Sequence, residues 1–249
     1  MNIIYEPRGR AREYSDLACN LYMGCSHGCR YCFAPACMRK SAEEWHNTTV
    51  ARKNAIPLFE KDAATLFDKR DKRPILFSFL SDPYQPLEKT EGLTHQALQT
   101  VQRYRLNSKI LTKGSIDLIQ RDLSLMKKAK TQLGITVCFV DDSSRAYWEP
   151  NASPADDRFE LLKEAHNMGI YTWVSLEPVI DPEQALEVIR KAAPYVDMWK
   201  VGKLNHMKSE EGKVDWYKFR IDVEALLKNI NAKYYIKEDL MNAKPSKNS

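Results

Sequence analysis

Short apolar runs with strand character alternate with longer segments of helical character along most of this 249-residue chain. The short runs predict strands at 16–22, 75–79, 109–112, 135–140, 171–176, 196–201 and 233–236. The longer segments predict helices at 90–103, 116–130, 156–167, 182–192 and 216–227. Strands that alternate with helices are typical of βα units around a parallel sheet. The pattern therefore predicts an α/β fold, a full or partial parallel (β/α)6 barrel of the TIM type.

No repeat, low-complexity block or break in composition divides the chain. Hydrophobic residues make up 43% of it, which is enough for one sizeable core, and α/β barrels of this length are routinely single domains. We therefore expect one domain over residues 1–240, a polar tail over 241–249, and a monomer.

The net charge, the apolar runs and the N-terminal residues bear on which partners the protein can bind and in which compartment it works. Lys and Arg number 38 against 33 Asp and Glu, a net charge of +5, which permits a nucleic-acid partner without requiring one. No apolar run reaches the length of about 18 residues that a membrane span needs, and the N-terminus is polar. We expect a cytoplasmic protein without a membrane contact, in which clustered cysteines stay reduced and serve as metal ligands or catalytic groups.

Cys25, Cys29 and Cys32 form a C-x3-C-x2-C run flanked by glycines that allow a tight loop. Thiolate sulfur suits iron, and a four-iron cluster held by only three cysteines leaves one iron open to a small molecule. A zinc site is the alternative, but zinc usually takes a fourth ligand, and His27 reaches that position only by straining the loop. The spacing predicts a [4Fe-4S] cluster.

Polar residues follow several predicted strands. In parallel barrels the chemistry gathers at the carboxyl ends of the strands. The residues placed there by the predicted boundaries are Asp82, Lys113, Asp141, Glu177 and Lys203.

The cysteine run, with Tyr31 just before its last cysteine, resembles the signature of the radical S-adenosylmethionine (radical SAM) superfamily. Four later motifs strengthen the resemblance: Ser-Asp-Pro-Tyr-Gln-Pro at 81–86, Leu-Thr-Lys at 111–113, Arg-Asp-Leu at 121–123, and Trp-Glu-Pro-Asn-Ala-Ser-Pro at 148–154 with Arg158. In this order they are similar to the spore photoproduct lyase-like branch, also called DNA-repair-photolyase-like. The similarity covers roughly residues 17–205.

The resemblance implies a barrel of the radical SAM kind and a defined chemistry. The three cysteines hold the [4Fe-4S] cluster, and S-adenosylmethionine binds its open iron. Reductive cleavage then gives methionine and a 5′-deoxyadenosyl radical, with electrons from a reductant such as flavodoxin or ferredoxin. The reaction is of lyase or transferase type, on a substrate that is unknown and for which nucleic acid or a nucleotide is one candidate.

The resemblance also implies roles for single residues. Lys113 is expected to meet the carboxylate of S-adenosylmethionine. Asp141 and Glu177 are candidates for binding the cofactor's amino group or ribose hydroxyls, although each could equally be an exposed loop acid.

Three further residues complete the candidate cofactor site. Tyr31 belongs to the cysteine loop itself. Ser81 and Asp82 are expected to shape the side of the site that faces the substrate, although Ser-Asp-Pro is also an ordinary turn signal.

The chain departs from spore photoproduct lyase at Phe79, where that enzyme has the cysteine that returns a hydrogen atom to the product radical. A short connection also replaces the hairpin used against duplex DNA, so repair of spore photoproduct is not expected. Cys138, in the predicted strand 135–140, and Tyr84 are the alternative hydrogen donors. A buried thiol in a strand is more often a small hydrophobe, and Tyr84 could simply pack in its turn.

Other functions remain open at this stage. One is a radical SAM modifier of a peptide or small molecule. Another is a non-catalytic iron–sulfur redox or sensor protein, in which Cys19 or Cys37 closes the cluster as the fourth ligand.

Overall fold

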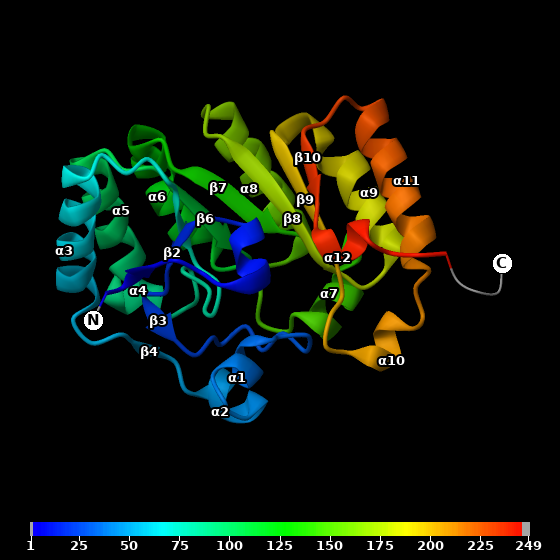
Figure 1. The fold of residues 1–249 in the computed structure, drawn as a ribbon, viewed down its shortest axis with the longest axis horizontal. Helices are drawn as coiled ribbons and strands as arrows, with labels where there is room; N and C mark the ends of the chain where they lie inside the picture. The colour runs from blue at the N-terminus through cyan, green and yellow to red at the C-terminus, as the bar shows by residue number, and fades with distance from the viewer. Residues whose placement is uncertain (1, 246–249) are drawn as a thin grey trace.

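The structure is a computed structural model that describes residues 2–245. Its centre is a curved sheet of eight strands (Figure 1). In spatial order these are β1 (Ile4–Tyr5), β2 (Leu17–Cys19), β5 (Ile75–Phe77), β6 (Ser108–Thr112), β7 (Gln132–Thr136), β8 (Thr172–Val179), β9 (Met198–Lys203) and β10 (Tyr234–Ile236). The seven strands from β2 to β10 run parallel, and β1 is antiparallel to β2. Within residues 2–245 the two outer strands do not pair, so the predicted α/β barrel is confirmed in its partial form.

Six long helices cover the outer face of the sheet, each packed against the next (Figure 1). They are α3 (Ala55–Asp68), α5 (Leu93–Tyr104), α6 (Ile116–Ala129), α8 (Ala155–Asn167), α9 (Pro182–Ala192) and α11 (Trp216–Asn229). Each shows its apolar residues on one side, as a helix on a sheet requires. Across residues 2–245 the helices all fall short of the length or apolar character needed to cross a membrane.

Short helices gather at the carboxyl ends of the strands, and several of them lie along the lower side of Figure 1. The helices are α1 (Ala34–Cys37), α2 (Ala42–Asn47), α4 (Glu88–Glu91), α7 (Asp142–Trp148), α10 (Lys208–Glu211) and α12 (Glu238–Met241). The 3-10 turn Ala193–Tyr195 precedes β9 and so lies at the other end of the strands. A small ribbon of β3 (Tyr22–Met23) and β4 (Val50–Ala51) frames the cysteine loop, and a 3-10 turn covers Gly9–Glu13. These elements surround the end of the barrel where chemistry is expected.

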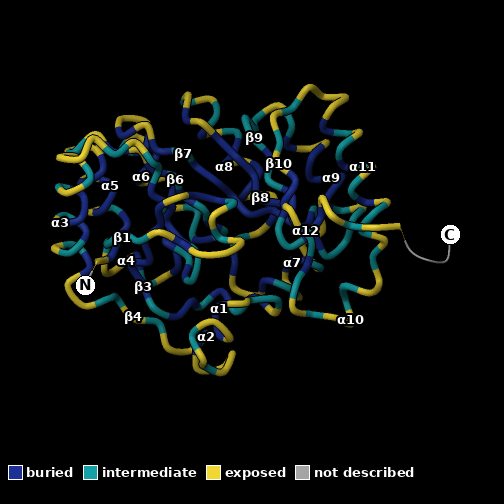
Figure 2. The backbone as a smooth tube through the Cα atoms, in the orientation of Figure 1, coloured by how far each residue is buried: buried dark blue, intermediate teal, exposed yellow. Residues whose placement is uncertain are grey.

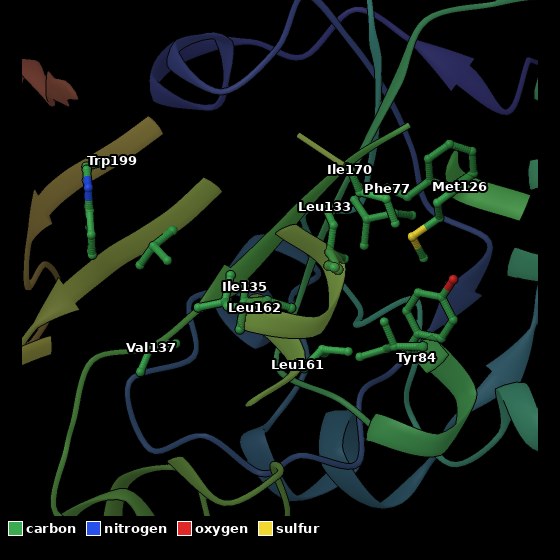
Figure 3. Close-up of a cluster of buried hydrophobic side chains, with 14 of the residues drawn as sticks. Phe77, Tyr84, Met126, Leu133, Ile135, Val137, Leu161, Leu162, Ile170 and Trp199 are labelled. Atoms are coloured by element: carbon green, nitrogen blue, oxygen red, sulfur yellow. The ribbon is translucent and has the colours of Figure 1, made fainter. Parts of the chain in front are cut away.

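The core lies between the strands and the long helices. Most residues of β6 to β8 are buried and none is exposed, whereas many residues on the outer sides of the helices are exposed (Figure 2). Leu133 and Ile135 of β7 belong to the same buried hydrophobic cluster as Leu161 and Leu162 of α8 (Figure 3). Burial of this apolar surface supplies the main driving force for the fold.

An N-terminal strap (residues 9–14) connects the two ends of the open sheet. It joins β1, the outer strand at one edge, to its neighbour β2, and its Glu13 contacts β9 and β10 at the other edge (Figure 1). The Glu13 carboxylate accepts hydrogen bonds from the Tyr235 hydroxyl at 3.1 Å and from the Glu238 amide at 3.0 Å. The Tyr14 carbonyl accepts one from Lys109 Nζ of β6 at 3.0 Å. The strap thereby links the two edges of the open sheet through side-chain hydrogen bonds.

Besides the short elements, which the sequence pattern does not predict, three longer parts of the chain differ from the sequence-based expectation. The strand predicted at 135–140 is β7, Gln132–Thr136, because the apolar residues 137–139 are buried in a loop after leaving the sheet. Residues 55–68 form α3, which was not predicted. The expected polar tail starts inside α12, and its residues 246–249 lie outside the described part of the chain.

Candidate active site

A cavity of about 300 Å³ opens at the carboxyl ends of the strands. One end, here the cysteine end, is lined by Cys25, Cys29, Tyr31, Cys32 and Phe33. A second group of lining residues, here the strap end, comes from the N-terminal strap and from the segments at and after the ends of β8, β9 and β10: Arg10, Ala11, Tyr14, Glu177, Pro178, Lys203, Leu204, Asn205, His206 and Lys237. Strand-end residues of β6, β7 and β8 form the floor between them.

The backbone of the cysteine loop is fixed by contacts on both sides. The Cys25 amide donates to the Trp45 carbonyl at 3.2 Å. Gly24 has φ of +77°, and a Cβ at this position would lie 2.1 Å from the Thr48 carbonyl oxygen, so only glycine fits here. The buried Gln85 amide donates to the Gly24 carbonyl and accepts from the Ser26 amide, both at 3.2 Å. The loop is therefore held in place by parts of the chain far from it in sequence.

The three thiols of this loop are largely shielded from water. Burial raises the pKa of Cys25 to about 12 and that of Cys29 to about 11, and it also raises the pKa of Cys32. Within residues 2–245 no three His, Cys, Asp or Glu side chains already stand at the mutual distances of a metal site. The donor set nevertheless fits an iron–sulfur cluster, because three sulfurs from one short loop line the same end of one cavity.

Lys113 brings a positive charge to this end. It follows β6, lines the cavity, and places its Nζ 5.5 Å from the centre of the Tyr31 ring. Burial by itself lowers the pKa of a lysine, but the nearby Cys29, Glu149 and Asp82 outweigh burial and raise the pKa of Lys113 above its ordinary value. The side chain is thus a cation in a position to meet a carboxylate.

Ser81 and Asp82 also line the cavity, and both anchor the loop after β5. Asp82 Oδ1 accepts from Thr112 Oγ1 at 2.6 Å, and Oδ2 accepts from the Lys113 amide at 2.9 Å. The Ser81 hydroxyl donates to the Tyr22 carbonyl at 2.9 Å. These contacts set the position of Lys113 relative to the cysteine loop.

Glu177, near the end of β8, lies at the strap end. Its carboxylate oxygens accept from Lys237 Nζ at 2.7 and 2.9 Å. It also accepts a hydrogen bond from the Tyr14 hydroxyl. The structure brings this predicted residue to the cavity with its negative charge already paired.

The structure does not bring Asp141, Tyr84 or Cys138 to the cavity wall. Asp141 is exposed at the start of α7, where hydrogen bonds from Ser143 and Ser144 lower the pKa of its carboxyl. Tyr84 is fully buried in the core, and its hydroxyl donates to Asp122 at 3.0 Å (Figure 3). Cys138 is fully buried two residues beyond β7, where burial raises the pKa of its thiol.

A buried ion pair behind the cysteine loop was not predicted. Arg158 Nη1 lies 2.7 Å from Glu149 Oε2, and both side chains are at most 1% exposed. The Tyr31 hydroxyl donates to the other oxygen of Glu149. Burial alone would raise the pKa of Glu149, but Arg158 and Lys113 hold it below its ordinary value. Both residues belong to motifs that carry the family resemblance, which was the available signal.

Asn151, from the same motif, holds the outside of the loop. Its side-chain amide donates to the Ser26 carbonyl at 2.9 Å, and its backbone amide donates to the His27 carbonyl at 3.1 Å. A Cβ on Gly28 would meet the Pro150 side chain at 3.4 Å. The segment 148–154 therefore packs directly on the loop that carries the three cysteines.

Comparison with known sequences finds relatives without an assigned activity. No family model matches the chain. It is 29% identical over 197 residues to an uncharacterised protein of Methanocaldococcus jannaschii, covering 78% of this chain and 72% of that protein. It is 28% identical over 169 residues to an uncharacterised protein of Mycobacterium tuberculosis, covering 65% of this chain and 48% of that protein.

Comparison with solved structures finds closely similar folds. Streptococcus suis SuiB bound to S-adenosylmethionine matches with a TM-score of 0.67 and 14% identity, over 92% of this chain and about half, 52%, of SuiB. Spore photoproduct lyase complexed with dinucleoside spore photoproduct matches with a TM-score of 0.68 and 13% identity, over 93% of this chain and 79% of the lyase. This chain thus has the fold of spore photoproduct lyase and SuiB, two radical SAM enzymes.

Proposed function

We propose that this protein is a radical SAM enzyme, which reductively cleaves S-adenosylmethionine and uses the resulting 5′-deoxyadenosyl radical on a second substrate. The observation that carries the proposal is that three thiols, two of them buried and one partly buried, line one cavity together with one cationic lysine. The fold is that of SuiB, whose solved structure holds S-adenosylmethionine.

The residues have distinct tasks in this proposal. Cys25, Cys29 and Cys32 hold a [4Fe-4S] cluster through their thiolates, and Lys113 binds the carboxylate of S-adenosylmethionine. When bound, the cluster and its cofactor supply one-electron chemistry that three thiols and a lysine cannot supply alone. Tyr31 is held by Glu149 beside Lys113, so it maintains the shape of the cofactor end.

Exclusion of water is the second task of the cavity. The apolar side chains of Phe33, Phe79, Leu80 and Leu111 line it. A reactive radical needs such surroundings, because water and exposed polar groups open side reactions. Phe79 also offers no transferable hydrogen of the kind that a thiol offers, so we do not propose repair of spore photoproduct.

The substrate and the partners are proposed only as classes. The structural neighbours include spore photoproduct lyase complexed with a dinucleoside and SuiB bound to its precursor peptide SuiA, so nucleotide and peptide substrates both have a precedent in this fold. A flavodoxin or ferredoxin is the proposed reductant. We propose a monomer that works in the cytoplasm, where such reductants are found.

Anaerobic reconstitution followed by product analysis tests the proposal. We expect about four irons per chain and formation of 5′-deoxyadenosine from S-adenosylmethionine after reduction. Cys29→Ala should abolish both, whereas Cys37→Ala, a matched change at an exposed cysteine, should retain both. A colourless protein that takes up zinc and forms no 5′-deoxyadenosine would exclude the proposed activity.

A second candidate is a non-catalytic cluster protein that uses Cys37 as its fourth ligand. One observation favours it: Cys37 lies only five residues beyond Cys32 and its side chain is exposed. Cys37 ends the short helix α1 directly after the cysteine loop. If Cys37→Ala loses the cluster as completely as Cys29→Ala, this second candidate is the better description.

A further inference from the structure

The strap end of the cavity holds more cationic than anionic side chains. Arg10, Lys203 and Lys237 line it, and Glu177 is the only acidic residue of the strap end that does so within residues 2–245. Lys237 binds both oxygens of Glu177, and the Tyr14 hydroxyl donates to the same carboxylate. This acid is therefore committed to Lys237, and Arg10 and Lys203 are left to other partners.

Arg10 lies on the N-terminal strap and uses only part of its hydrogen-bonding capacity. Its Nη1 donates to Asn205 Oδ1 at 2.9 Å and to Asp239 Oδ2 at 3.1 Å. Within residues 2–245 its Nε and Nη2 groups make no hydrogen bond, and 58% of the side chain is exposed. A guanidinium carries five N–H donors in a fixed plane, so several donors remain free for a ligand.

Lys203, at the end of β9, is more buried and less well paired. Its nearest acidic atom is Glu211 Oε2 at 3.7 Å, which is too far for a hydrogen bond. Its Nζ lies 5.9 Å from the centre of the Trp216 ring, and the side chain is only 22% exposed. Within residues 2–245 the Lys203 ammonium group has no hydrogen-bond acceptor, only the distant Glu211 carboxylate. An anionic ligand in the cavity would supply an acceptor at closer range.

Two acids outside the cavity, Asp239 and Glu211, lie near these cations but leave donors available for an anionic ligand. Asp239 is shared between Arg10 and the Asn205 amide, which donates to it at 2.8 Å. Glu211 accepts a hydrogen bond from the Met207 amide at 3.0 Å. Asp239 therefore pairs with Arg10 through Nη1 alone, and Glu211 stays 3.7 Å from the Lys203 nitrogen. The remaining donors of Arg10 and the ammonium group of Lys203 suit the oxygen atoms of an anion.

We propose that Arg10 and Lys203 bind an oxyanion group of the substrate, a phosphate or a carboxylate, at the strap end. That the ligand is the substrate rests on the proposed radical SAM function. Under that function S-adenosylmethionine occupies the cysteine end beside Lys113, so the oxyanion site is separate from the cofactor site. Arginine and lysine are the side chains that commonly bind phosphate and carboxylate groups.

Equilibrium dialysis of the reconstituted protein with radiolabelled inorganic phosphate tests this site. We expect one phosphate per chain, bound at least about 10-fold more weakly by Lys203→Gln and by Arg10→Gln, since each removes a charged hydrogen-bond donor. Lys208→Gln and Arg8→Gln remove the same charges from exposed positions outside the cavity and should bind as the parent does. Circular dichroism melting shows that each variant is folded, and Lys203→Arg should retain binding.

Competition experiments with S-adenosylmethionine and with acetate identify where phosphate binds and which anionic group the site accepts. Saturating S-adenosylmethionine should leave phosphate binding unchanged; displacement would place the cations in the cofactor site and overturn the proposal. Equal binding by all variants would overturn it as well. Acetate that competes at similar concentration would identify a carboxylate as an equally suitable group, and failure of acetate to compete would identify phosphate; both support the oxyanion site.

The two proposals fail in different ways. A protein that forms 5′-deoxyadenosine but binds no phosphate or acetate at the strap end keeps its proposed function and loses this site. A protein that binds phosphate through Arg10 and Lys203 but cleaves no S-adenosylmethionine keeps the oxyanion site and loses the proposed function.

Discussion

Replacing Arg158 by leucine should destabilise this protein strongly, because it leaves the Glu149 carboxylate buried without its partner. The pair is 2.7 Å apart and neither side chain exceeds 1% exposure. Removing one member of such a pair typically costs about 3–5 kcal/mol. Arg158 also donates to the carbonyls of Ser153 at 2.8 Å and Thr136 at 2.9 Å, which would lose their donors.

For a chain of this size each kcal/mol corresponds to about 2–4 °C in the melting temperature. We therefore expect Arg158→Leu to lower the midpoint by about 6–20 °C in thermal unfolding followed by circular dichroism. Adding Glu149→Met to Arg158→Leu should restore part of the lost stability, because the double variant no longer buries an unpaired carboxylate.

Lys163→Met provides the control. Lys163 pairs with Glu160 at 3.6 Å, but both side chains are well exposed, so its loss should change stability by less than about 1 kcal/mol. If Arg158→Leu changes stability as little as this control does, the ion pair does not hold the segment behind the cysteine loop, and the reasoning is refuted.

Two further predictions concern the loop and the barrel interior. Gly24→Ala should prevent cluster uptake, measured as iron per chain, because its Cβ would lie 2.1 Å from the Thr48 carbonyl oxygen. The control is Gly169→Ala, which is also at positive φ but has open space around it and should retain the iron. Equal iron uptake by both variants would contradict this prediction. Burial, aided by neighbouring lysines, lowers the pKa of Lys200 to about 8 from an ordinary value of 10.5. Between about pH 8 and 10.5 the Lys200 side chain is protonated in the unfolded chain but not in the folded protein. The free energy of unfolding of the parent, relative to that of Lys200→Met, should therefore rise with pH across this range. If urea unfolding shows a constant difference between the two proteins, Lys200 does not titrate as described.

The parts of the site that were predicted are those set by local sequence. Cys25, Cys29 and Cys32 share one short loop, so their spacing alone places them together. Lys113 and Glu177 were found because they occur at or near the ends of well-marked strands, and parallel strands present those ends at one face. The strand–helix alternation likewise indicated the α/β fold, since it depends on residue patterns within each element.

The parts that were missed depend on contacts between distant segments or on where a strand ends. Asp141 was expected at a strand end, but β7 ends at Thr136 and the apolar residues after it are buried as a loop, a pattern that resembles a strand in sequence. The bond between Tyr31 and Glu149 joins residues 118 positions apart. The contact of Tyr14 with Ser175 spans 161 positions. Such pairings follow from the curvature of the sheet and the path of the strap rather than from any local pattern.

The central claim is that three cysteines hold a cluster to which S-adenosylmethionine binds, with Lys113 as the partner of its carboxylate. Electron paramagnetic resonance of the reduced, reconstituted protein tests this most directly. We predict that adding S-adenosylmethionine changes the cluster spectrum of the parent protein, and that Lys113→Met needs at least about 10-fold more of it for the same change. A spectrum that stays the same at saturating S-adenosylmethionine would contradict the account.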